Sequence, residues 1–395
     1  MSLNDMKRKW IAATIMSVFL ISLVLVMVSQ HTTPHERLPT NISPILIDAE
    51  SDFDAEHGVV GGSGIISDPY VIEGWQIDVS RDCPERSCTG IVVQNANASF
   101  VIRNVIIRGG IYDNGIRFSG VKNARLESVL VESGGDGISV VASINVTLFR
   151  NVVVGDDRGI FVTQSHDVWV CASSISLGVQ GIVVEDASRI SLLDNILTGN
   201  KANGVLFLHV TNSTLEGNTI TETSFRGIAL FNSSDIVASR NRIVGSGEEC
   251  LYVASGGRTS MIQNEVSNCE WAGVSVYKSD ENLVKDNLVA RTPSGVLFSD
   301  SSRNVAAFNS VTDTGWGITI ASDSDANYIV ENTVSLSAHV GILLIRFDDH
   351  TPDRNIIQGN TVSQSGDADL LDSSGGTDNL WRFNAYEKEI PSTSD

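Results

Sequence analysis

A glycine followed by isoleucine or valine recurs every 22–25 residues over most of this 395-residue chain. The glycines are Gly90, Gly115, Gly137, Gly159, Gly181, Gly204, Gly227, Gly273, Gly295, Gly317 and Gly341, and Cys250 fills the one vacant place. A unit of this length, rich in β-branched residues, is too short for the common helical repeats. The L-x-x-L-x-L pattern of leucine-rich repeats is also absent. The repeat therefore constrains the fold class before any other feature is considered.

An asparagine later in each unit keeps step with the glycine. These asparagines are Asn104, Asn151, Asn195, Asn218, Asn241, Asn264, Asn287, Asn309, Asn332 and Asn360, with Ser173 and Val129 in the two vacant places. Apolar residues alternate after each glycine and flank each asparagine, which predicts three short strands per unit. The chain is therefore predicted to be an all-β, single-domain parallel β-helix of about 12 coils, roughly 55–60 Å long at the usual strand spacing.

The asparagine has a physical reason in such a fold. Equivalent residues of successive coils stack about 4.8 Å apart, so an inward-pointing amide can bond the coils above and below it. Ser173 can partly imitate this role, whereas Val129 cannot. We therefore expect a local irregularity at Val129.

The open ends of a β-helix are unpaired sheet edges that need cover. Residues 44–89 are expected to form an N-terminal cap and leading coil, with Tyr70 and Trp75 over the first apolar layer. Residues 90–386 form the predicted β-helix, whose last coil carries Trp381, Asn384 and Tyr386. Residues 387–395 are predicted to be a disordered tail.

The N-terminal region predicts a membrane anchor. Residues 10–28 carry no charge and are long enough to cross a bilayer as a helix. Three basic residues at positions 7–9 should keep residues 1–9 in the cytoplasm. No A-x-A cleavage pattern follows, which favours an uncleaved signal anchor with a linker at 29–43 over a cleaved signal peptide. In both cases the β-helix is extracytoplasmic.

Further sequence features agree with an oxidising, extracytoplasmic location. N-x-S/T glycosylation sequons occur at Asn41, Asn97, Asn145, Asn212 and Asn232. Cys83 and Cys88 flank a short loop and are the preferred disulfide pair, while Cys250 and Cys269 are a weaker candidate pair. Cys171 is left over.

The net charge of −20 argues against a nucleic-acid partner, which needs a basic face.

A cluster of aspartates is the sharpest candidate for catalysis. Asp113, Asp136, Asp156 and Asp157 precede successive first strands, and Asp113 and Asp157 share a register two coils apart. Stacked carboxylates raise one pKa or recruit a cation such as Ca²⁺, and they could act as general acid and base on a polysaccharide. The competing interpretation is a surface ion-pair ladder, because Arg158 is in register with Asp136.

Aromatic residues provide a candidate binding surface. Phe231, Tyr252 and Tyr277 occupy positions predicted to face outward on the first strand of their units. Exposed rings there could stack on sugar faces or on a partner protein. The competing interpretation is that a loop or a second subunit covers these positions.

The chain resembles the NosD-type right-handed parallel β-helix proteins, also described as carbohydrate-binding and sugar-hydrolysis (CASH) domains. The resemblance rests on "DFDAEHGVVGGSGIISDPYVIEGWQI" followed by serial G-I-x-V and N-x-V coils, over about residues 44–386. It implies the right-handed fold, an extracytoplasmic location and relatives such as pectate lyases, polygalacturonases and alginate epimerases. The founder of the group is an accessory protein in copper-enzyme maturation.

The residues themselves do not predict a copper site. The histidines His31, His35, His57, His166, His209, His339 and His350 share no single column, and only Met261 lies within the repeats. No metal site or resident cofactor is therefore predicted, with Ca²⁺ kept as the alternative. The leading function is a membrane-anchored binding scaffold for carbohydrate or surface proteins. The alternatives are a polysaccharide lyase, hydrolase or epimerase and, after these, a copper-site maturation accessory protein.

Overall fold

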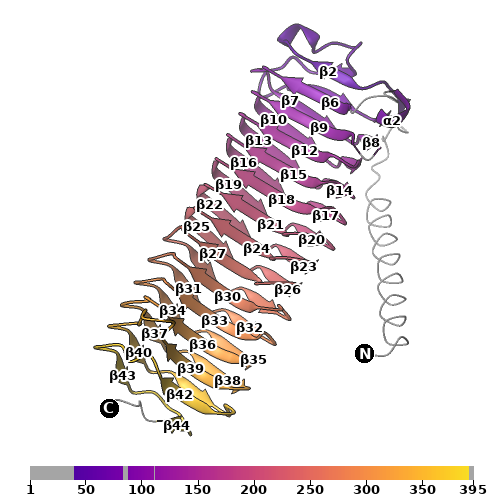
Figure 1. Ribbon diagram of the computed structural model, residues 1–395. Helices are drawn as coiled ribbons and strands as arrows, with labels where there is room; N and C mark the ends of the chain where they lie inside the picture. Colours follow the sequence, from indigo (N-terminus) through magenta and orange to yellow (C-terminus); the bar gives the residue numbers. More distant parts are fainter. Residues whose placement is uncertain (1–39, 83–87, 111, 391–395) are drawn as a thin grey trace, which may run out of the picture. The chain divides into compact units, whose positions relative to one another are not determined.

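Three parallel sheets wind around a common core in the part of the chain that the structure describes (Figure 1). The structure is a computed structural model, and it describes residues 40–82, 88–110 and 112–390. The residues from Asn41 onward form one compact unit. Each coil passes through sheet C, then sheet A, then sheet B, so that every strand pairs with its equivalent one coil away. This confirms the predicted parallel β-helix, although the coils number about 13 rather than 12.

Sheet A consists of β1 (Thr40–Asn41), β5 (Trp75–Asp78), β8 (Ile106–Arg108), β11 (Leu130–Glu132), β14 (Val152–Val154), β17 (Ser174–Ser176), β20 (Ile196–Thr198), β23 (Thr219–Thr223), β26 (Arg242–Ser246), β29 (Glu265–Ser267), β32 (Leu288–Ala290), β35 (Ser310–Thr314), β38 (Thr333–Ser337) and β41 (Thr361–Ser363). Sheet B consists of β2 (Ile45–Ile47), β6 (Thr89–Gln94), β9 (Asn114–Ser119), β12 (Asp136–Val141), β15 (Arg158–Thr163), β18 (Gln180–Glu185), β21 (Val205–Leu208), β24 (Ile228–Phe231), β27 (Leu251–Ala254), β30 (Ala272–Tyr277), β33 (Ser294–Ser299), β36 (Trp316–Ala321), β39 (Val340–Ile345), β42 (Ala368–Asp372) and β44 (Glu389–Ile390). Sheet C consists of β3 (Val59–Gly61), β4 (Tyr70–Glu73), β7 (Phe100–Arg103), β10 (Lys122–Glu127), β13 (Ile144–Phe149), β16 (His166–Cys171), β19 (Ser188–Leu193), β22 (Thr211–Glu216), β25 (Ser234–Ser239), β28 (Ser260–Ile262), β31 (Leu283–Lys285), β34 (Val305–Ala307), β37 (Tyr328–Val330), β40 (Ile356–Gln358) and β43 (Leu380–Arg382).

The core is the stack of inward-facing side chains from all three sheets. Ile116 and Phe118 of one coil lie beside Ile138 and Val140 of the next, and all four side chains are fully buried. Side chains that alternate along a strand point to opposite faces, so the apolar alternation after each glycine places one row inside every coil. The predicted alternation is therefore confirmed.

The predicted asparagine ladder lies at the corner between sheets C and A. Asn241 shows the pattern: its Nδ2 donates to Leu215 O (2.9 Å) and to Asn264 Oδ1 (3.0 Å), and its backbone N–H donates to Asn264 Oδ1 (3.0 Å). The same bonds between neighbouring amides run without a break from Asn195 to Asn384. One amide per coil thus satisfies backbone groups that would otherwise be buried without partners.

Two expectations about this ladder are wrong. Asn104 is not a rung, because Ile106 pairs with Leu130 and the residue before Ile106 is Val105. Asn104 is instead half-buried, with φ of 52°, and its amide donates to Glu73 Oε1 (3.2 Å). Val129 also causes no irregularity, because the strands on both sides of it keep their register and its N–H donates to Asn151 Oδ1 (3.1 Å).

A second asparagine ladder, which sequence reasoning missed, lies at the corner between sheets B and C. It runs through Asn282, Asn304, Asn327, Asn355 and Asn379. Three residues earlier in the coil, a row of serine hydroxyls takes a similar part in both early and late coils, as where the Ser143 N–H donates to Ser165 Oγ (3.0 Å) and the Ser279 N–H donates to Ser301 Oγ (3.1 Å). Both devices supply an acceptor to the N–H groups of a turn.

The N-terminal end is covered by β2, by the 3-10 helix η1 (Glu50–Asp52) and by the antiparallel pair β3 and β4. Phe53 stacks on Tyr70 with ring centroids 4.7 Å apart, and Trp75 Nε1 donates to Gly58 O (2.8 Å). Tyr70 and Trp75 pack against the core, as the sequence suggested. The short helix α2 (Val79–Asp82) follows β5.

The predicted anchor at residues 10–28 lies outside the described residues, as do residues 391–395. Within the described ranges, no helix is long and apolar enough to cross a membrane. Strand β44 extends the described chain to Ile390, within the segment for which the sequence predicted a disordered tail.

Candidate functional site

The four aspartates of the predicted cluster lie at the corner between sheets A and B. Asp136 pairs with Arg158 across β12 and β15. The Gly135 N–H donates to Asp113 O and the Asp157 N–H donates to Gly135 O, both at 2.8 Å. The predicted registers are therefore confirmed.

Two of these carboxylates are already engaged in holding the turns. Asp136 forms a two-point ion pair with Arg158, with Nε–Oδ1 and Nη2–Oδ2 distances of 2.7 Å. Asp113 is buried and accepts from the backbone N–H of Cys88 (3.0 Å) and of Gly110 (2.7 Å). These contacts favour the ion-pair interpretation of the cluster over direct action on a substrate.

Asp156 is a buried acid. Its residue is 1% exposed, its Oδ1 accepts a hydrogen bond from Ser133 Oγ, and its Oδ2 has no partner. The pKa of Asp156 is raised to about 8, mainly by burial and in smaller part by the nearby Asp136, while the Ser133 hydrogen bond opposes the rise. Asp156 thus carries a proton at neutral pH but has no open path to a substrate, whereas Asp157 is exposed.

The aromatic residues Phe231, Tyr252 and Tyr277 come from three successive coils of sheet B. The rings of Phe231 and Tyr252 meet edge to face, 5.4 Å apart. The Arg226 guanidinium lies 4.3 Å from the centroid of Tyr252, and burial raises the pKa of that phenol. Lys278 Nζ lies 5.0 Å from the Tyr277 ring. The sequence predicted outward-facing positions for these residues; Phe231 and Tyr277 are half-buried, and Tyr252 is only 9% exposed.

Arg226 is the centre of this aromatic group. Its Nε lies 2.7 Å from Glu249 Oε2 and its Nη2 lies 2.6 Å from Glu248 Oε2. Burial raises the pKa of Glu248, while Arg226 opposes that rise. Because its charge is matched by two carboxylates, Arg226 serves to fix the rings of Phe231 and Tyr252 rather than to bind an anion.

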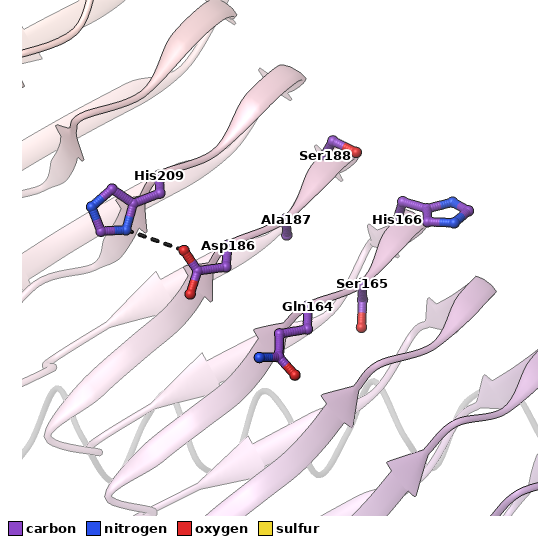
Figure 2. Close-up of a pocket in the computed structure, with 7 residues that line it drawn as sticks. All are labelled: Gln164, Ser165, His166, Asp186, Ala187, Ser188 and His209. Carbon is purple, nitrogen blue, oxygen red and sulfur yellow. Dashed lines mark ion pairs between the residues drawn. The ribbon is translucent and has the colours of Figure 1, made fainter.

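A shallow polar pocket of about 420 Å³ lies at the corner between sheets B and C. It is lined by Gln164, Ser165, His166, Asp186, Ala187, Ser188 and His209 (Figure 2). His209 Nδ1 lies 3.2 Å from Asp186 Oδ1, and Asn232 Nδ2 lies 3.5 Å from His209 Nε2. In this arrangement Nδ1 faces the Asp186 carboxylate and Nε2 faces the amide of Asn232.

On the other side of the pocket, His166 belongs to a charged group with Asp167 and Arg189. Arg189 Nε lies 2.7 Å from Asp167 Oδ1, and Arg189 Nη2 lies 2.8 Å from His166 Nδ1. The pKa of Asp167 is lowered, mainly by its hydrogen bond to Arg189. Sequence reasoning missed this pocket. The available signal was the spacing of Asp186, His209 and Asn232, which are 23 residues apart and so stack in one column.

The pocket and the aromatic group are neighbours. The His209 N–H donates to Phe231 O (3.1 Å), so Phe231 and Asn232 lie one coil above the end of the pocket. We call the pocket together with Phe231, Tyr252 and Tyr277 the recognition surface. It offers hydroxyl, amide, imidazole and carboxylate groups beside aromatic rings, a combination suited to binding a polyhydroxyl ligand.

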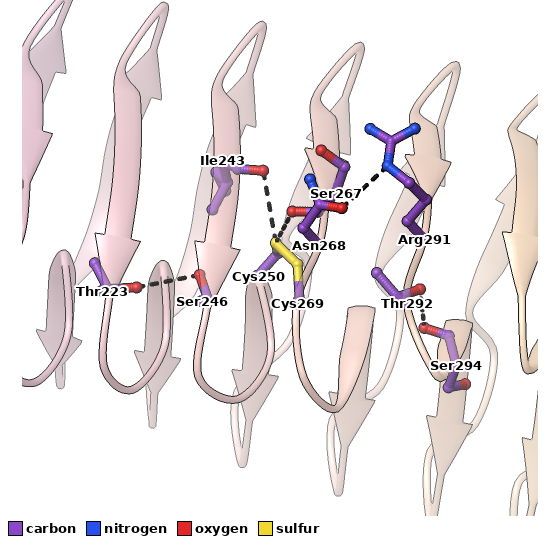
Figure 3. The surroundings of a disulfide bond; sticks show 10 residues. All are labelled: Thr223, Ile243, Ser246, Cys250, Ser267, Asn268, Cys269, Arg291, Thr292 and Ser294. Carbon is purple, nitrogen blue, oxygen red and sulfur yellow. Dashed lines mark hydrogen bonds between the residues drawn. A yellow bond between two sulfur atoms is a disulfide. The ribbon is translucent and has the colours of Figure 1, made fainter. Parts of the chain in front are cut away.

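The disulfide between Cys250 and Cys269 explains the one break in the glycine repeat. In other coils, a small polar side chain packs against the glycine of the preceding coil, as Ser246 does against Gly227. Any side chain on that glycine would meet backbone atoms of the next coil. Cys250 occupies the glycine position and Cys269 the position of Ser246, with Cα atoms 5.6 Å apart (Figure 3). The pair that the sequence ranked lower is therefore the one seen between described residues.

The other cysteines and the sequons can be placed as well. Cys88 is disulfide-bonded, while its predicted partner Cys83 lies outside the described residues. Cys171 is a half-buried free thiol whose pKa is raised by burial. All the sequon asparagines lie at exposed positions, namely Asn41, Asn97, Asn145, Asn212 and Asn232.

The donor groups of the described chain do not fit a copper site. Among residues 40–82, 88–110 and 112–390, no group of three or more His, Cys, Asp or Glu residues could hold a metal ion. Each described histidine instead contacts a carboxylate, as His339 does with Asp367 (3.1 Å) and His350 with Asp323 (2.6 Å). Met261 is fully buried in the core.

Comparisons with known proteins agree with this architecture. The family described as "Periplasmic copper-binding protein (NosD)" matches residues 72–270, and the "Right handed beta helix region" matches residues 226–385. No curated protein matches the chain in sequence.

Solved structures with the same fold include alginate epimerases. The A-module of the mannuronan C-5 epimerase AlgE4 of Azotobacter vinelandii is 14% identical, with a TM-score of 0.55 over 89% of this chain and 97% of that one. The periplasmic alginate epimerase AlgG is 12% identical, with a TM-score of 0.54 over 81% of this chain and 85% of that one. At these identities the likeness is one of fold alone. Because the first family match spans about half of the chain and the coils continue beyond it, the protein belongs to the NosD family and is a right-handed parallel β-helix.

Proposed function

We propose that this protein is an extracytoplasmic carbohydrate-binding scaffold that uses the recognition surface. The observation that carries the proposal is the polar pocket with Asp186 and His209, whose His209 backbone is hydrogen-bonded to Phe231 on the next coil. Sugars present hydroxyl groups at their edges and apolar C–H faces, which suit the pocket and the rings respectively. The periplasmic description of the family and the epimerases of the same fold support this choice.

The scaffold is proposed to be held at the membrane by residues 10–28. That segment is uncharged and follows a basic N-terminus. Membrane fractionation of the expressed full chain, followed by a carbonate wash, tests this part. Release of the protein by the wash would contradict an anchor.

The binding proposal is tested with the purified full chain on a glycan array, followed by calorimetry with each saccharide that is retained. His209→Ala and Phe231→Ala should each weaken binding about tenfold, which corresponds to about 1.4 kcal/mol. His350→Ala is a matched control, because it removes another exposed histidine that pairs with an aspartate, away from the pocket. Equal effects of His209→Ala and His350→Ala, or no retained saccharide, would contradict the proposal.

A polysaccharide lyase, hydrolase or epimerase acting through the aspartate cluster is the second candidate. Its support is the exposed Asp157 close to the protonated Asp156. The same saccharides should be incubated with the protein, with and without Ca²⁺, and assayed for new reducing ends, unsaturated products or epimerised units. Turnover that is lost in Asp157→Ala or Asp136→Ala would replace the binding proposal with an enzymatic one.

Copper handling ranks after these candidates. The family description supports it, whereas the donor groups of the described residues do not. Titration of the full chain with Cu(I) and Cu(II), in competition with a chelator, tests this candidate directly. Micromolar or tighter binding at a defined stoichiometry would make copper the leading function.

A further inference from the structure

We propose that Phe225, Trp271 and Trp316 form a second binding track, for an extended polysaccharide without acidic groups that runs parallel to the axis of the β-helix. The three side chains are 37%, 62% and 41% exposed. They lie at the corner between sheets A and B, whereas the pocket lies at the corner between sheets B and C, at the other end of the sheet B strands. The inference rests on the proposed carbohydrate binding and extends it to a second surface, which meets the recognition surface at Arg226.

The spacing of the rings follows from the backbone. The Glu248 N–H donates to Phe225 O (3.1 Å) and the Trp271 N–H donates to Glu248 O (3.2 Å), so Phe225 and Trp271 share a column two coils apart. The Ser294 N–H donates to Trp271 O and the Trp316 N–H donates to Pro293 O, which places Trp316 two coils further and one residue along. Two coils correspond to roughly 10 Å. That distance is comparable to the disaccharide repeat of an extended chain, so the rings can meet alternate sugars.

Neighbouring groups restrict the movement of the three rings. The Arg226 guanidinium lies 4.5 Å from the centroid of Phe225, and the His339 ring stacks on Trp316 with centroids 4.8 Å apart. Trp271 follows Cys269 by two residues, so the disulfide to Cys250 fixes the corner from which it projects. Rings fixed in this way lose little conformational entropy when a ligand stacks on them.

The charge of the track selects the ligand class. Glu270 and Asp313 are exposed near the tryptophans, Glu248 lies between Phe225 and Trp271, and these three carboxylates outnumber Arg291, an exposed cation of the same corner. The positive charge of Arg226 is matched by Glu248 and Glu249. A polyuronate would meet like charges here, whereas a neutral or amino-sugar chain would not.

The experiment uses the full chain and hexamers of β-1,4-linked glucose, β-1,4-linked N-acetylglucosamine and mannuronate, with binding followed by tryptophan fluorescence and calorimetry. At least one of the first two hexamers should bind more tightly than the mannuronate hexamer. Trp271→Ala should weaken that binding tenfold or more, and Trp316→Ala about fivefold. Phe308→Ala is the control, because Phe308 is 54% exposed but lies at the corner between sheets C and A. Tighter binding of mannuronate would overturn the charge argument.

A second variant tests the spacing without changing the number of rings. Pro293 is exposed and lies one coil above Trp271 in the same column. Trp271→Ala combined with Pro293→Trp moves the ring by one coil, and we expect hexamer binding to stay as weak as in Trp271→Ala alone. Restored binding would overturn the spacing argument. If His209→Ala abolishes hexamer binding while Trp271→Ala and Trp316→Ala leave it unchanged, the track is wrong and the recognition surface stands. If no saccharide binds at all, both proposals fail.

Discussion

The coils before Asn151 and the coils after Asn195 use different residues to stabilise the corner between sheets C and A. In the later coils an unbroken row of buried amides joins each coil to the next at the corner between sheets C and A. In the earlier coils Val105 and Val129 occupy that position, and both are buried in the core. The strands keep the same register in both regions. Stacking is therefore set by strand pairing and the apolar core, and the amides add stability to a corner that forms without them.

The largest expected effect is the removal of one amide from the middle of the ladder. Asn264→Ala deprives the Asn241 N–H and amide of an acceptor and leaves Ala238 O without its donor (2.9 Å). Buried groups left unpaired cost about 1–3 kcal/mol each, so we expect a loss of about 3–5 kcal/mol. Urea unfolding measures the change. A loss below 1 kcal/mol would show that the asparagine row stabilises the later coils no more than the buried valines stabilise the earlier ones.

Loss of the disulfide should rank second. Cys250→Gly combined with Cys269→Ser restores the glycine and serine found at the equivalent places of the preceding coil. The variant should lose about 3 kcal/mol, the usual contribution of a cross-link closing a loop of this size. It should also be less destabilised by a reducing agent than the wild type, because the disulfide of Cys88 is the one that remains to be reduced among the described cysteines. An unchanged melting temperature would mean that the disulfide adds no stability beyond the packing that a glycine and a serine provide at the same places.

Asp156→Asn tests how the earlier coils tolerate a buried acid. The raised pKa of Asp156, about 8, means that its contribution is fully present below about pH 4 and is lost as the pH rises towards 8, because the folded protein holds a proton that the unfolded chain has released. The variant should lack this slope, so it should be more stable than the wild type by about 2 kcal/mol already at about pH 5.5 and gain about 1.4 kcal/mol more for each further pH unit up to 8. Parallel stability curves from pH 4 to 8 would contradict the assignment.

The smallest effect is expected where the sequence suggested a rung that the structure does not contain. Asn104→Ala removes a half-buried amide that bonds to Glu73, so the loss should stay below about 1 kcal/mol. Compared with Asn264→Ala, this variant measures the value of the ladder position itself. Losses of similar size at both positions would mean that Asn104 does more than its single contact suggests.

Much of the fold could be predicted from the sequence because every coil must bury an apolar row and satisfy the backbone groups of the same turns. The glycine and asparagine markers predicted the strands, the inward rows and the rungs from Asn151 onward. They failed at Asn104 because a one-residue offset keeps nearly the same spacing, and only the pairing of Ile106 with Leu130 resolves it.

The sites were harder to predict because they depend on side chains from different coils. The registers of Asp113, Asp136 and Asp157 followed from counting, as did the ion pair of Arg158 with Asp136 as the competing interpretation, but the burial of Asp156 did not. The pocket at His209 was missed because each column that lines it contains a histidine in only one coil. The asparagine ladder, by contrast, repeats the same residue from coil to coil.

The asparagine row also has a direction. Every amide oxygen serves the coil before it, as Asn218 Oδ1 does for the Asn195 N–H, so a coil's turn is completed only when its successor has been laid down. A chain made from its amino end therefore always carries one unfinished turn at its growing tip, and Asn384 is the last residue to close one. The direction of these hydrogen bonds is therefore compatible with coils that are completed one after another in the order in which the chain is synthesised.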